Sequence, residues 1–334
     1  MKNLINQACC FLFATVFVLL AAGCAAGGDT ATDKNTAADK NITADEILEN
    51  AKSVIFQDDL GYEVSVEAPQ RVAALGGSFA ETWMLAGGSL AAATDDAWTE
   101  WQLELAGEVV NLGSLKDPDV EQMILNGIDL VILNANLSGH VELRDTLEAV
   151  GMTTAYFEVE TFEDYLEMLS VCTEITGKPE LYEQNGLAVK AEIEDIIGQQ
   201  KQSGPRVLFL QALSTKVKAK NSDCMTGAML KDLGCVNIAD SENGLLEDLS
   251  MEAIILEDPD FIFVTIHGGS TEKAQQMLKE SLENHPAWRE LSAVKNERYI
   301  FLPKDLFHQK PNHRWAESYE MLAEILYGAE LNEE

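Results

Sequence analysis

DVEQMILNGIDLVIL (119–133) recurs later in the chain as SMEAIILEDPDFIFV (250–264), and this repeat decides the fold. Each copy reads as a short helix, a turn with an aspartate, and then an apolar run of the length of a buried strand. The glutamates of the two copies, Glu121 and Glu252, are 131 positions apart (252 − 121 = 131), and the aspartates obey the same offset. The repeat predicts two similar halves.

Strand-like and helix-like segments alternate on both sides of this repeat. RVAAL (71–75) is followed by two glycines and a helical segment (79–85), and RVLFLQAL (206–213) opens a second alternation. Between them, residues 162–200 are almost continuously helical in composition, with an interruption near 177–179. Strands joined to helices through short glycine loops favour parallel sheets. We therefore predict an α/β protein with two βαβ lobes of mostly parallel sheets, one long interlobe helix, and a ligand cleft between the lobes.

The N-terminus has the pattern of an export signal. Lys2 precedes an apolar run (8–22) that is shorter than the roughly 20 residues of a membrane-spanning helix. The run ends in small residues followed by Cys24, which resembles a bacterial lipoprotein signal. That resemblance implies cleavage before Cys24, palmitate or another lipid on this cysteine, and anchoring to the cell membrane; an ordinary signal peptide or an uncleaved anchor is the alternative.

The chain of 334 residues has room for roughly two domains of about 150 residues. Residues 25–43 are rich in Gly, Ala, Thr, Asp and Asn, so they cannot bury enough apolar surface to order themselves. The predicted division is a signal peptide (1–23), a flexible tether (24–50), an N-terminal α/β lobe (51–160), a helical connection including the interlobe helix (161–204) and a C-terminal α/β lobe (205–330).

Net charge disfavours some classes of partner, and the cysteine count leaves open whether one disulfide forms. The formal net charge of −33 disfavours nucleic acid and anionic bilayers as partners, because both require a cationic face. Beyond the signal and Cys24, three cysteines remain: Cys172, Cys224 and Cys235. A Cys224–Cys235 disulfide and small buried thiols are both compatible with this count, and there is no disulfide framework.

The leader, tether and twin lobes together resemble the ABC-transporter substrate-binding lipoproteins that carry ferric siderophores, heme or corrinoids, the class III periplasmic-binding-protein-like group. The resemblance runs from about residue 52 to 328 and rests on APQRVAALGGSFAETWMLAGG (68–88), GSLKDPDVEQMILNGIDLVIL (113–133), MTGAMLKDLGCVNIA (225–239), SMEAIILEDPDFIFV (250–264) and HPAWRELSAVKNERYIFLP (285–303). It implies a monomeric, extracytoplasmic, non-catalytic receptor for iron transport. The implied ligand is a ferric siderophore, with heme or cobalamin as the alternative, and no covalent cofactor.

The same resemblance gives the repeated glutamates a role. Members of the family present one exposed glutamate from each lobe to basic sockets on the permease dimer. Glu121 and Glu252 occupy the matching motifs. Equivalent positions in two similar lobes suit a two-fold partner, and opposite charges orient a transient encounter. We expect these two residues to dock on an ABC permease.

The loops that follow the strands should line the cleft, because ligands of open α/β sheets bind beyond the carboxyl ends of the strands. His267 directly follows the apolar run FIFVTI and precedes two glycines, so its imidazole could bind a ligand or coordinate iron. Heme-binding relatives pair such a histidine with a methionine of the first lobe, but Lys116 stands about at that position here. The expected ligand-binding residues are Ser78, Phe79, Trp98, Lys116, Asn134, Lys220, His267, His308 and Arg314.

The chemistry expected of the other residues follows from their type. Lys116 could contact an anionic chelate, and Trp98 with Trp101 could form an aromatic wall. His308 and Arg314 lie at the start of the last predicted helix, where an anion can bind; Arg314 could equally pair with an acidic neighbour.

Other functions remain open at this point. A surface lipoprotein enzyme is one, although the chain has no GxSxG, HExxH, GxxxxGK[ST] or strand-linked GxGxxG pattern. A divalent-metal carrier is another, and it would need several histidines and carboxylates around one ion. A surface adhesion protein with an empty cleft is the third.

Overall fold

The computed structural model describes residues 53–200, 204–241, 245–246, 249–268 and 270–331. The expected signal peptide (1–23), the expected lipidation site Cys24 and the whole expected tether (24–50) lie outside these residues. Every described residue belongs to one unit of the chain, residues 50–334. In the described part, no helix combines the length and the apolar character that crossing a membrane requires.

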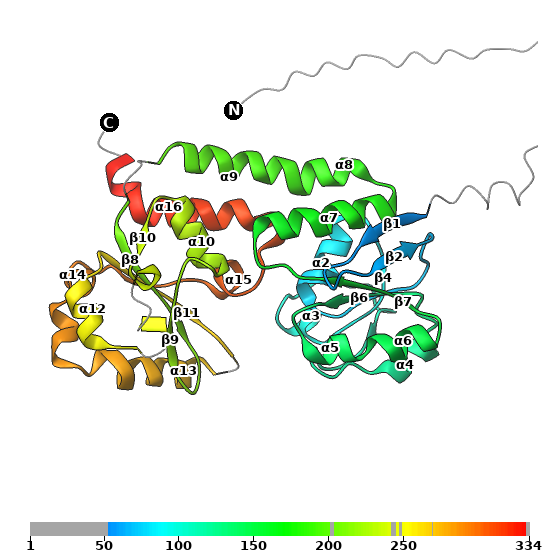
Figure 1. Ribbon diagram of the computed structural model, residues 1–334, viewed down its shortest axis with the longest axis horizontal. Coiled ribbons are helices and arrows are strands. Elements are labelled where there is room, and N and C mark those ends of the chain that lie inside the picture. Colours follow the sequence, from blue (N-terminus) through cyan, green and yellow to red (C-terminus); the bar gives the residue numbers. More distant parts are fainter. Residues whose placement is uncertain (1–52, 201–203, 242–244, 247–248, 269, 332–334) are drawn as a thin grey trace, which may run out of the picture. The chain divides into compact units, whose positions relative to one another are not determined.

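The N-terminal lobe is built on a parallel sheet of five strands. Its strands lie in the order β5-β4-β3-β6-β7, and an antiparallel hairpin of β1 and β2 precedes them in the chain (Figure 1). The strands are β1 (Val54–Gln57), β2 (Glu63–Val66), β3 (Val72–Ala74), β4 (Leu90–Ala93), β5 (Val110–Asn111), β6 (Leu130–Asn134) and β7 (Thr153–Phe157). The helices are α2 (Gly77–Leu85), α3 (Asp96–Thr99), α4 (Val120–Leu125), α5 (Ser138–Glu142) and α6 (Arg144–Ala149).

The C-terminal lobe has a second sheet in which β9 is the antiparallel strand. Its order is β10-β8-β11-β12, with β9 paired to β8. The strands are β8 (Arg206–Ala212), β9 (Val217–Lys220), β10 (Val236–Asn237), β11 (Phe261–Ile266) and β12 (Tyr299–Phe301). The helices are α10 (Met225–Asp232), η2 (Ile238–Asp240), α12 (Met251–Glu257), α13 (Thr271–Leu278), η3 (Lys279–Glu283), η4 (Pro286–Glu290), α14 (Ser292–Lys295), α15 (Lys304–Phe307), η5 (Asn312–Arg314) and α16 (Trp315–Leu331). The predicted α/β fold with mostly parallel sheets is confirmed.

The connection between the lobes contains two helical runs. The first, α7 (Phe162–Thr176), begins at a capping box in which Thr161 and Asp164 bond each other's backbone N–H, and it ends at Gly177, whose φ is 68°. The second runs without a break through α8 (Pro179–Tyr182), η1 (Glu183–Leu187) and α9 (Ala188–Gly198). α7 packs on α2, whereas α9 packs on α16 (Figure 1). The long interlobe helix is therefore the second run.

One hydrophobic core is common to both lobes. It includes one face of each sheet, with Ile132 of β6 and Phe263 of β11 among its members, together with residues of α2, α7, α10 and α16. The opposite face of each sheet has a core of its own, which α4 covers in the N-terminal lobe and α12 covers in the C-terminal lobe. The two repeat helices thus occupy equivalent layers.

The repeated aspartates anchor the strands. The Asp129 carboxylate accepts a hydrogen bond from the backbone N–H of Arg71, just before β3, at 3.0 Å. In the same way, Asp260 accepts from the N–H of Arg206, the first residue of β8, at 2.9 Å. Both copies of the repeat thus use an aspartate to bond a backbone N–H at the start of the neighbouring strand.

Candidate functional site

Two adjacent cavities lie where segments of both lobes meet. The first, called here the histidine cavity, has a volume of about 200 Å³ and is lined by Glu160, Phe209, Gln211, Lys220, Cys224, Met225, Thr226, His267, Phe307, His308 and Lys310. The second, the tryptophan cavity, has about 190 Å³ and is lined by Leu75, Gly76, Ser78, Phe79, Asp96, Glu100, Trp101, Leu115, Asn134, His308, Gln309 and Lys310. His308 and Lys310 line both, so the two cavities form one candidate site.

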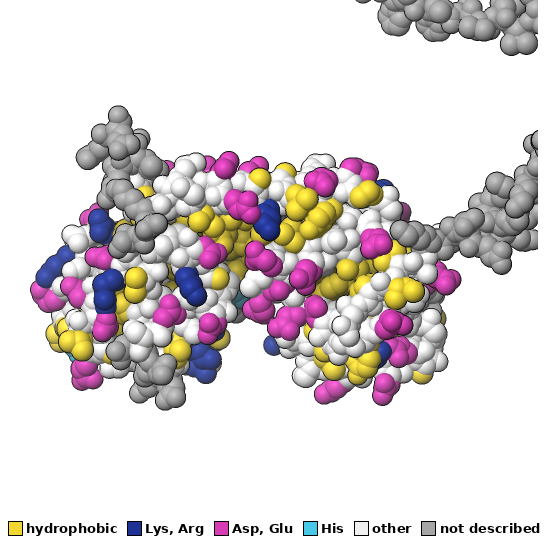
Figure 2. Space-filling view, turned by 45° about the horizontal axis from the view of Figure 1, so that its top comes forward, with side chains coloured by type: hydrophobic (Ala, Val, Ile, Leu, Met, Phe, Trp, Pro, Cys, Tyr) yellow, Lys and Arg dark blue, Asp and Glu magenta, His cyan; other side chains and the backbone are white. Residues whose placement is uncertain are grey.

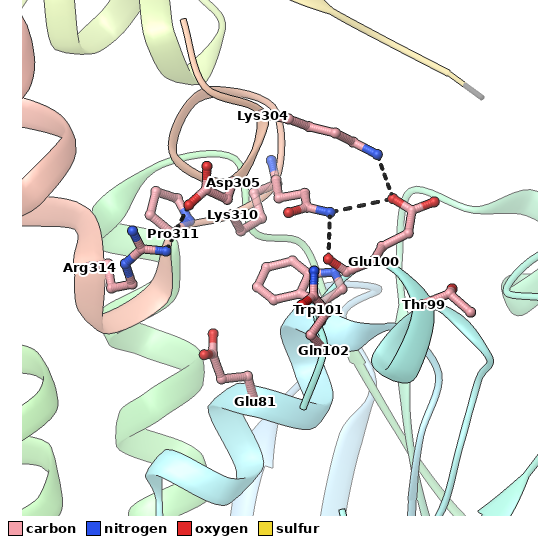
Figure 3. A pocket seen from close by; sticks show the side chains of 11 residues that line it. Glu81, Thr99, Glu100, Trp101, Gln102, Lys304, Asp305, Lys310, Pro311 and Arg314 are labelled. Atoms are coloured by element: carbon pink, nitrogen blue, oxygen red, sulfur yellow. Dashed lines mark hydrogen bonds and ion pairs between the residues drawn. The ribbon is translucent and has the colours of Figure 1, made fainter. Parts of the chain in front are cut away.

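A third and larger cavity extends this site outward. It measures about 530 Å³ and shares Glu100, Trp101, Gln309 and Lys310 with the tryptophan cavity. Figure 3 shows that its walls come from α2 and α3 on one side and from the segment around α15 and η5 on the other. Together the cavities give room for a ligand larger than a bare ion.

Two histidines from different segments contact each other in the histidine cavity. His267 follows β11 and His308 follows α15, and their ring centroids are 3.6 Å apart with an interplanar angle of 53°. The His267 backbone N–H is held by the carbonyl oxygen of Ala212 at 2.9 Å. Its Nε2 and the Thr265 hydroxyl share a hydrogen bond of 3.0 Å. Strand β11 and its neighbour β8 therefore fix one ring, and α15 positions the other.

Both imidazoles are kept neutral. Burial is the main cause that lowers the pKa of His267 to about 3; repulsion from His308, whenever that ring is protonated, and from Lys220 acts in the same direction. Burial also lowers the pKa of His308 to about 4, with a further contribution from Lys304 that Glu100 opposes. Neutral imidazoles retain a nitrogen lone pair near pH 7, so this pair can accept hydrogen bonds or coordinate a metal.

Charge is unevenly distributed across the site. Three lysines of the C-terminal lobe, Lys220, Lys304 and Lys310, line its cavities. Figure 2 shows acidic side chains gathered where the lobes approach each other, and basic ones more frequent on the C-terminal lobe. Lys304 pairs with Glu100 at 2.8 Å and Lys310 pairs with Glu160 at 3.6 Å, each pair joining the two sides of the site.

The segment from Lys304 to Asn312 ties the C-terminal lobe to α2 and α3. Lys304 and Gln309 both bond the carboxylate of Glu100. Figure 3 shows the contact between Lys304 and Glu100. Asn312 is 1% exposed, and its Nδ2 donates to the Ser78 carbonyl oxygen at 3.0 Å and to Glu81 Oε2 at 2.7 Å. His308 lies in the middle of this segment, so the ring and these contacts between the lobes belong to one short stretch of chain.

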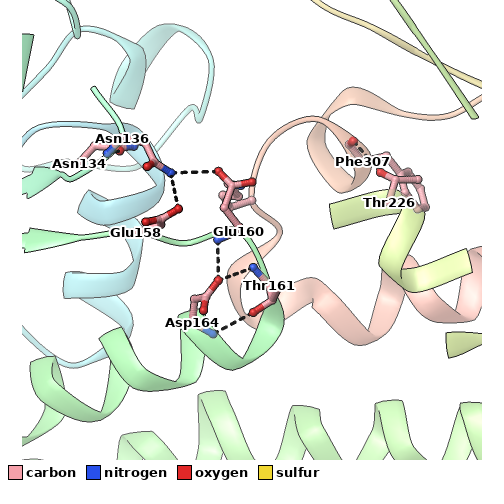
Figure 4. A network of polar contacts seen from close by, with 9 residues as sticks. Asn134, Asn136, Glu158, Glu160, Thr161, Asp164, Thr226 and Phe307 are labelled. Carbon is pink, nitrogen blue, oxygen red and sulfur yellow. Dashed lines mark hydrogen bonds and ion pairs between the residues drawn. The ribbon is translucent and has the colours of Figure 1, made fainter. Parts of the chain in front are cut away.

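A network of polar contacts holds Glu158 and Glu160 in place on the N-terminal side of the site. Asn136 Nδ2 donates to Glu158 at 2.9 Å and to Glu160 at 3.3 Å, and Asp164 accepts from the backbone N–H of Glu160 and of Thr161 (Figure 4). Opposite this network, the Thr226 hydroxyl bonds the Phe307 carbonyl oxygen at 3.0 Å and so positions the end of α15. The start of α7 thereby fixes Glu160 beside Lys310.

One of the two predicted tryptophans lines the cavities and the other packs on the core. Trp101 lines the tryptophan cavity, while Trp98 packs against the hydrophobic core shared by the lobes. Trp101 also lies directly over Gly77, where a Cβ atom would be 2.0 Å from the indole Cδ1. Glycine at the first position of α2 therefore allows the indole to reach its place.

The other expected ligand-binding residues are placed as follows. Ser78, Phe79 and Asn134 line the tryptophan cavity, and Lys220 lines the histidine cavity. Lys116 is exposed on the loop after β5. Arg314 borders the outer cavity, but its guanidinium is paired with Asp305 at 2.9 Å and Glu317 at 2.5 Å, which raise its pKa. These two carboxylates neutralise the positive charge of Arg314, which was expected to bind an anionic ligand.

The remaining expectations concern glutamates, cysteines and metals. Glu121 and Glu252 are exposed on α4 and α12. Cys172, Cys224 and Cys235 are free thiols, so Cys224 and Cys235 do not pair. Burial raises the pKa of Cys172 and Cys235 to about 12, so both thiols stay protonated. No cluster of three or more His, Cys, Asp or Glu side chains in the described part could hold a metal ion.

Lys310 was expected near an anion site together with His308, whereas Glu100, Glu160 and Lys304 are among the lining residues that were not expected from the sequence. Lys304 and Lys310 flank His308 within PKDLFHQKP (303–311), so the density of basic residues was the available signal. The two glutamates have no comparable signal, because they are two among 56 acidic residues.

The chain resembles known proteins in sequence pattern and in fold. A family model described as periplasmic binding protein matches residues 72–306. No curated protein is significantly similar to the chain in sequence. The solved structure of the catecholate-siderophore binding protein VctP from Vibrio cholerae is 16% identical, with a TM-score of 0.65, over 83% of this chain and 100% of that one.

Two further structures share the fold. IsdE of Staphylococcus aureus, solved in complex with heme, is 16% identical with a TM-score of 0.62, over 77% of this chain and 98% of that one. The vitamin B12 binding protein BtuF of Vibrio cholerae is 18% identical with a TM-score of 0.61, over 79% of this chain and 98% of that one. At identities this low, the structural match shows a common fold and does not identify the ligand.

Proposed function

Because the chain belongs to the periplasmic binding protein family, we propose that it captures a ferric siderophore in the cavities between its lobes and delivers it to an ABC permease. Members of this family are the substrate-binding components of ABC importers; they bind a ligand and release it unchanged. The chain is accordingly a binding protein and not an enzyme. The ligand, the docking residues and the membrane anchor are the subjects of the proposal.

The observation that carries the ligand proposal is the histidine pair with lysines beside it. Siderophores present negatively charged oxygen donors around Fe³⁺, and such a complex suits a site that offers Lys220 and Lys310 together with uncharged imidazoles. His267 and His308 can bond the chelate oxygens or coordinate the iron where the chelator leaves positions free. Trp101 and Phe79 supply apolar surface in the adjoining cavity.

The geometry of the pair argues against a heme iron held by both rings at once. An iron bound by both rings on opposite faces of a heme would stand about 2 Å from each ring nitrogen, which places the two nitrogens about 4 Å apart and the ring centres further still. The centroids of His267 and His308 are only 3.6 Å apart. The pair therefore suits adjacent positions around one ligand. Among the matched structures, VctP is named for a catecholate siderophore, IsdE for heme and BtuF for vitamin B12.

In this proposal Glu121 and Glu252 dock the protein on the permease, and a lipid on Cys24 anchors it to the membrane. The two glutamates lie at the same position of the two repeat helices, and both are exposed. A permease built as a two-fold dimer would present the same basic socket to each. We further propose that the protein works as a monomer, anchored outside the cytoplasm by a lipid on Cys24.

A melting-temperature panel tests the ligand. The mature chain, beginning at Cys24, is heated with ferric catecholate, ferric hydroxamate, hemin and cobalamin. The proposal predicts that a ferric siderophore raises the melting temperature, because a ligand bound only by the folded state stabilises it. His267→Gln should reduce that shift, whereas His313→Gln, a change of an exposed histidine, should not.

Two outcomes would replace the proposal. If hemin alone raised the melting temperature, with a Soret band that His267→Ala removed, the ligand would be heme. If none of the four raised it, the iron-chelate class would be wrong. Docking is tested separately: Glu121→Lys with Glu252→Lys should abolish uptake and spare ligand affinity.

A further inference from the structure

The two helices of the repeat bury equivalent side chains. α4 buries Met123 and α12 buries Ile254, and both are 0% exposed. These two residues are separated by the same 131 positions as the glutamates (254 − 123 = 131). Each packs on the sheet face opposite to the core that the lobes share. The helices are therefore equivalent in packing, and their outward faces can be compared position by position.

The outward faces carry apolar residues at equivalent positions. Leu125 is 77% exposed and Leu256 is 83% exposed, and these are the two most exposed large hydrophobic side chains in the described chain. The isoleucine before each, Ile124 and Ile255, is also exposed, at 47% and 39%. A single exposed leucine is ordinary on a protein surface. The same exposure at the same position of both repeats is a property of the motif.

Each exposed leucine lies beside the glutamate of its own helix. Glu121 and Leu125 are four residues apart in α4, as are Glu252 and Leu256 in α12, and this spacing places two side chains on one face of a helix. Each lobe thus presents a compact surface with one carboxylate and one fully accessible leucine. We call these two surfaces the Glu-Leu faces.

We propose that Leu125 and Leu256 are apolar anchors of permease docking, in addition to the two glutamates. The proposal rests on the docking function proposed above and specifies its chemistry. The partner is a membrane-protein dimer that presents, on each subunit, a cationic side chain next to an apolar socket. Desolvated apolar side chains contribute much of the free energy of an interface, whereas exposed charges mainly orient the encounter.

Charge argues against the other occupants of these faces. A second copy of this chain would oppose glutamate to glutamate, and the net charge of −33 adds to that repulsion. The anionic surface of a bilayer would repel the same carboxylates. A cationic socket complements both Glu-Leu faces, and a two-fold partner complements their duplication.

The test measures uptake and ligand binding on the same variants. Full-length chains are expressed in the source organism lacking its own copy, and the label is iron-55 bound in the ferric chelate that raises the melting temperature most. The test variant is Leu125→Gln with Leu256→Gln. The matched control is Ile55→Gln, a change of a residue that is 62% exposed on β1 and lies outside the repeat.

We expect the double leucine variant to lose about tenfold or more in uptake, equivalent to about 1.4 kcal/mol of docking free energy. Each single variant should lose about threefold, and Ile55→Gln should match the wild type. Ligand affinity and the amount of protein on the cell should stay unchanged in every variant. The leucines lie on solvent-exposed helix faces, so glutamine preserves the fold.

Other results separate the two levels of the proposal. If the leucine variant transported normally while Glu121→Lys with Glu252→Lys did not, the apolar anchors would be refuted and docking by the glutamates would stand. If neither double variant reduced uptake, docking through α4 and α12 would itself be wrong. Loss of ligand affinity in the leucine variant would also overturn the assignment.

Discussion

The rings of His267 and His308 lie 3.6 Å apart, centre to centre, although the two residues are 41 positions apart in the chain (308 − 267 = 41). Burial lowers the pKa of both below the usual histidine value. The described part of the site thus combines two uncharged imidazoles with nearby lysines. Because the rings are neutral, the site does not hold two further positive charges in contact with each other beside these lysines.

Removing either imidazole should weaken ligand binding. His308→Gln is expected to raise the dissociation constant of the ferric siderophore by about tenfold or more, which is the scale on which changes around a bound metal act. His308 lines both cavities, so its loss affects contacts on both sides. Quenching of tryptophan fluorescence provides the measurement, because Trp101 lines the same cavity. An unchanged constant would remove His308 from the site.

Stability should fall as the pH drops below 6.5. The folded-state pKa values of His267 and His308 are about 3 and about 4, both below the unfolded value of 6.5. Between these values the unfolded chain binds more protons than the folded one, so acid favours unfolding. The free energy of unfolding, measured with urea from pH 7.5 to pH 4.5, should decrease more in the wild type than in His267→Gln/His308→Gln. Parallel pH profiles would contradict the pKa assignment.

Asn312 should be a costly position to change. Its backbone has φ of 51°, and its side chain bonds Ser78 and Glu81 while 1% exposed. Asn312→Ala loses both hydrogen bonds and should lower the free energy of unfolding by about 2–4 kcal/mol. Glu81→Gln keeps an acceptor for the Asn312 amide and should change it far less. Urea denaturation measures both, and equal effects would show that the bonds to Asn312 contribute little.

Gly77→Ala should displace Trp101. The added Cβ would lie 2.0 Å from the indole, so the ring or α2 must shift. Overpacking of this kind costs about 1–3 kcal/mol, and the altered cavity wall should weaken siderophore binding as well. Gly198→Ala, at the end of α9 where a Cβ meets nothing within 4 Å, is the control. Tryptophan fluorescence and unfolding free energy of the two variants should differ clearly.

The repeat allowed much of the fold to be predicted from the sequence. The apolar runs that became β6 and β11 are bounded by Asp129 and Asp260, whose carboxylates hold the neighbouring strands, so the local pattern and the tertiary contact coincide. The same logic predicted that His267 would follow a strand end. Local periodicity gives strands and their ends because those depend on residues near in sequence.

Other features of the site depend on how distant segments pack. Trp98 and Trp101 are three residues apart, and their sequence does not indicate which one faces the core. The pairing of Arg314 with Asp305 depends on the turn between α15 and η5. The ties from Lys304 to Glu100 and from Lys310 to Glu160 join residues far apart in the chain. Sequence patterns without a repeat or a strand end carry no information about such contacts.

The segment from Lys304 to Asn312 has an evolutionary consequence. It supplies His308 to the cavities and also the side chains that connect α15 and η5 to Glu100, Ser78 and Glu81. A mutation within this segment that reshapes the pocket therefore also acts on the contacts that join the two lobes. A change of ligand specificity through this segment would require compensating substitutions at its partners in the N-terminal lobe, such as Glu100 or Glu81. Residues outside the segment, such as Lys220, can change without affecting these contacts.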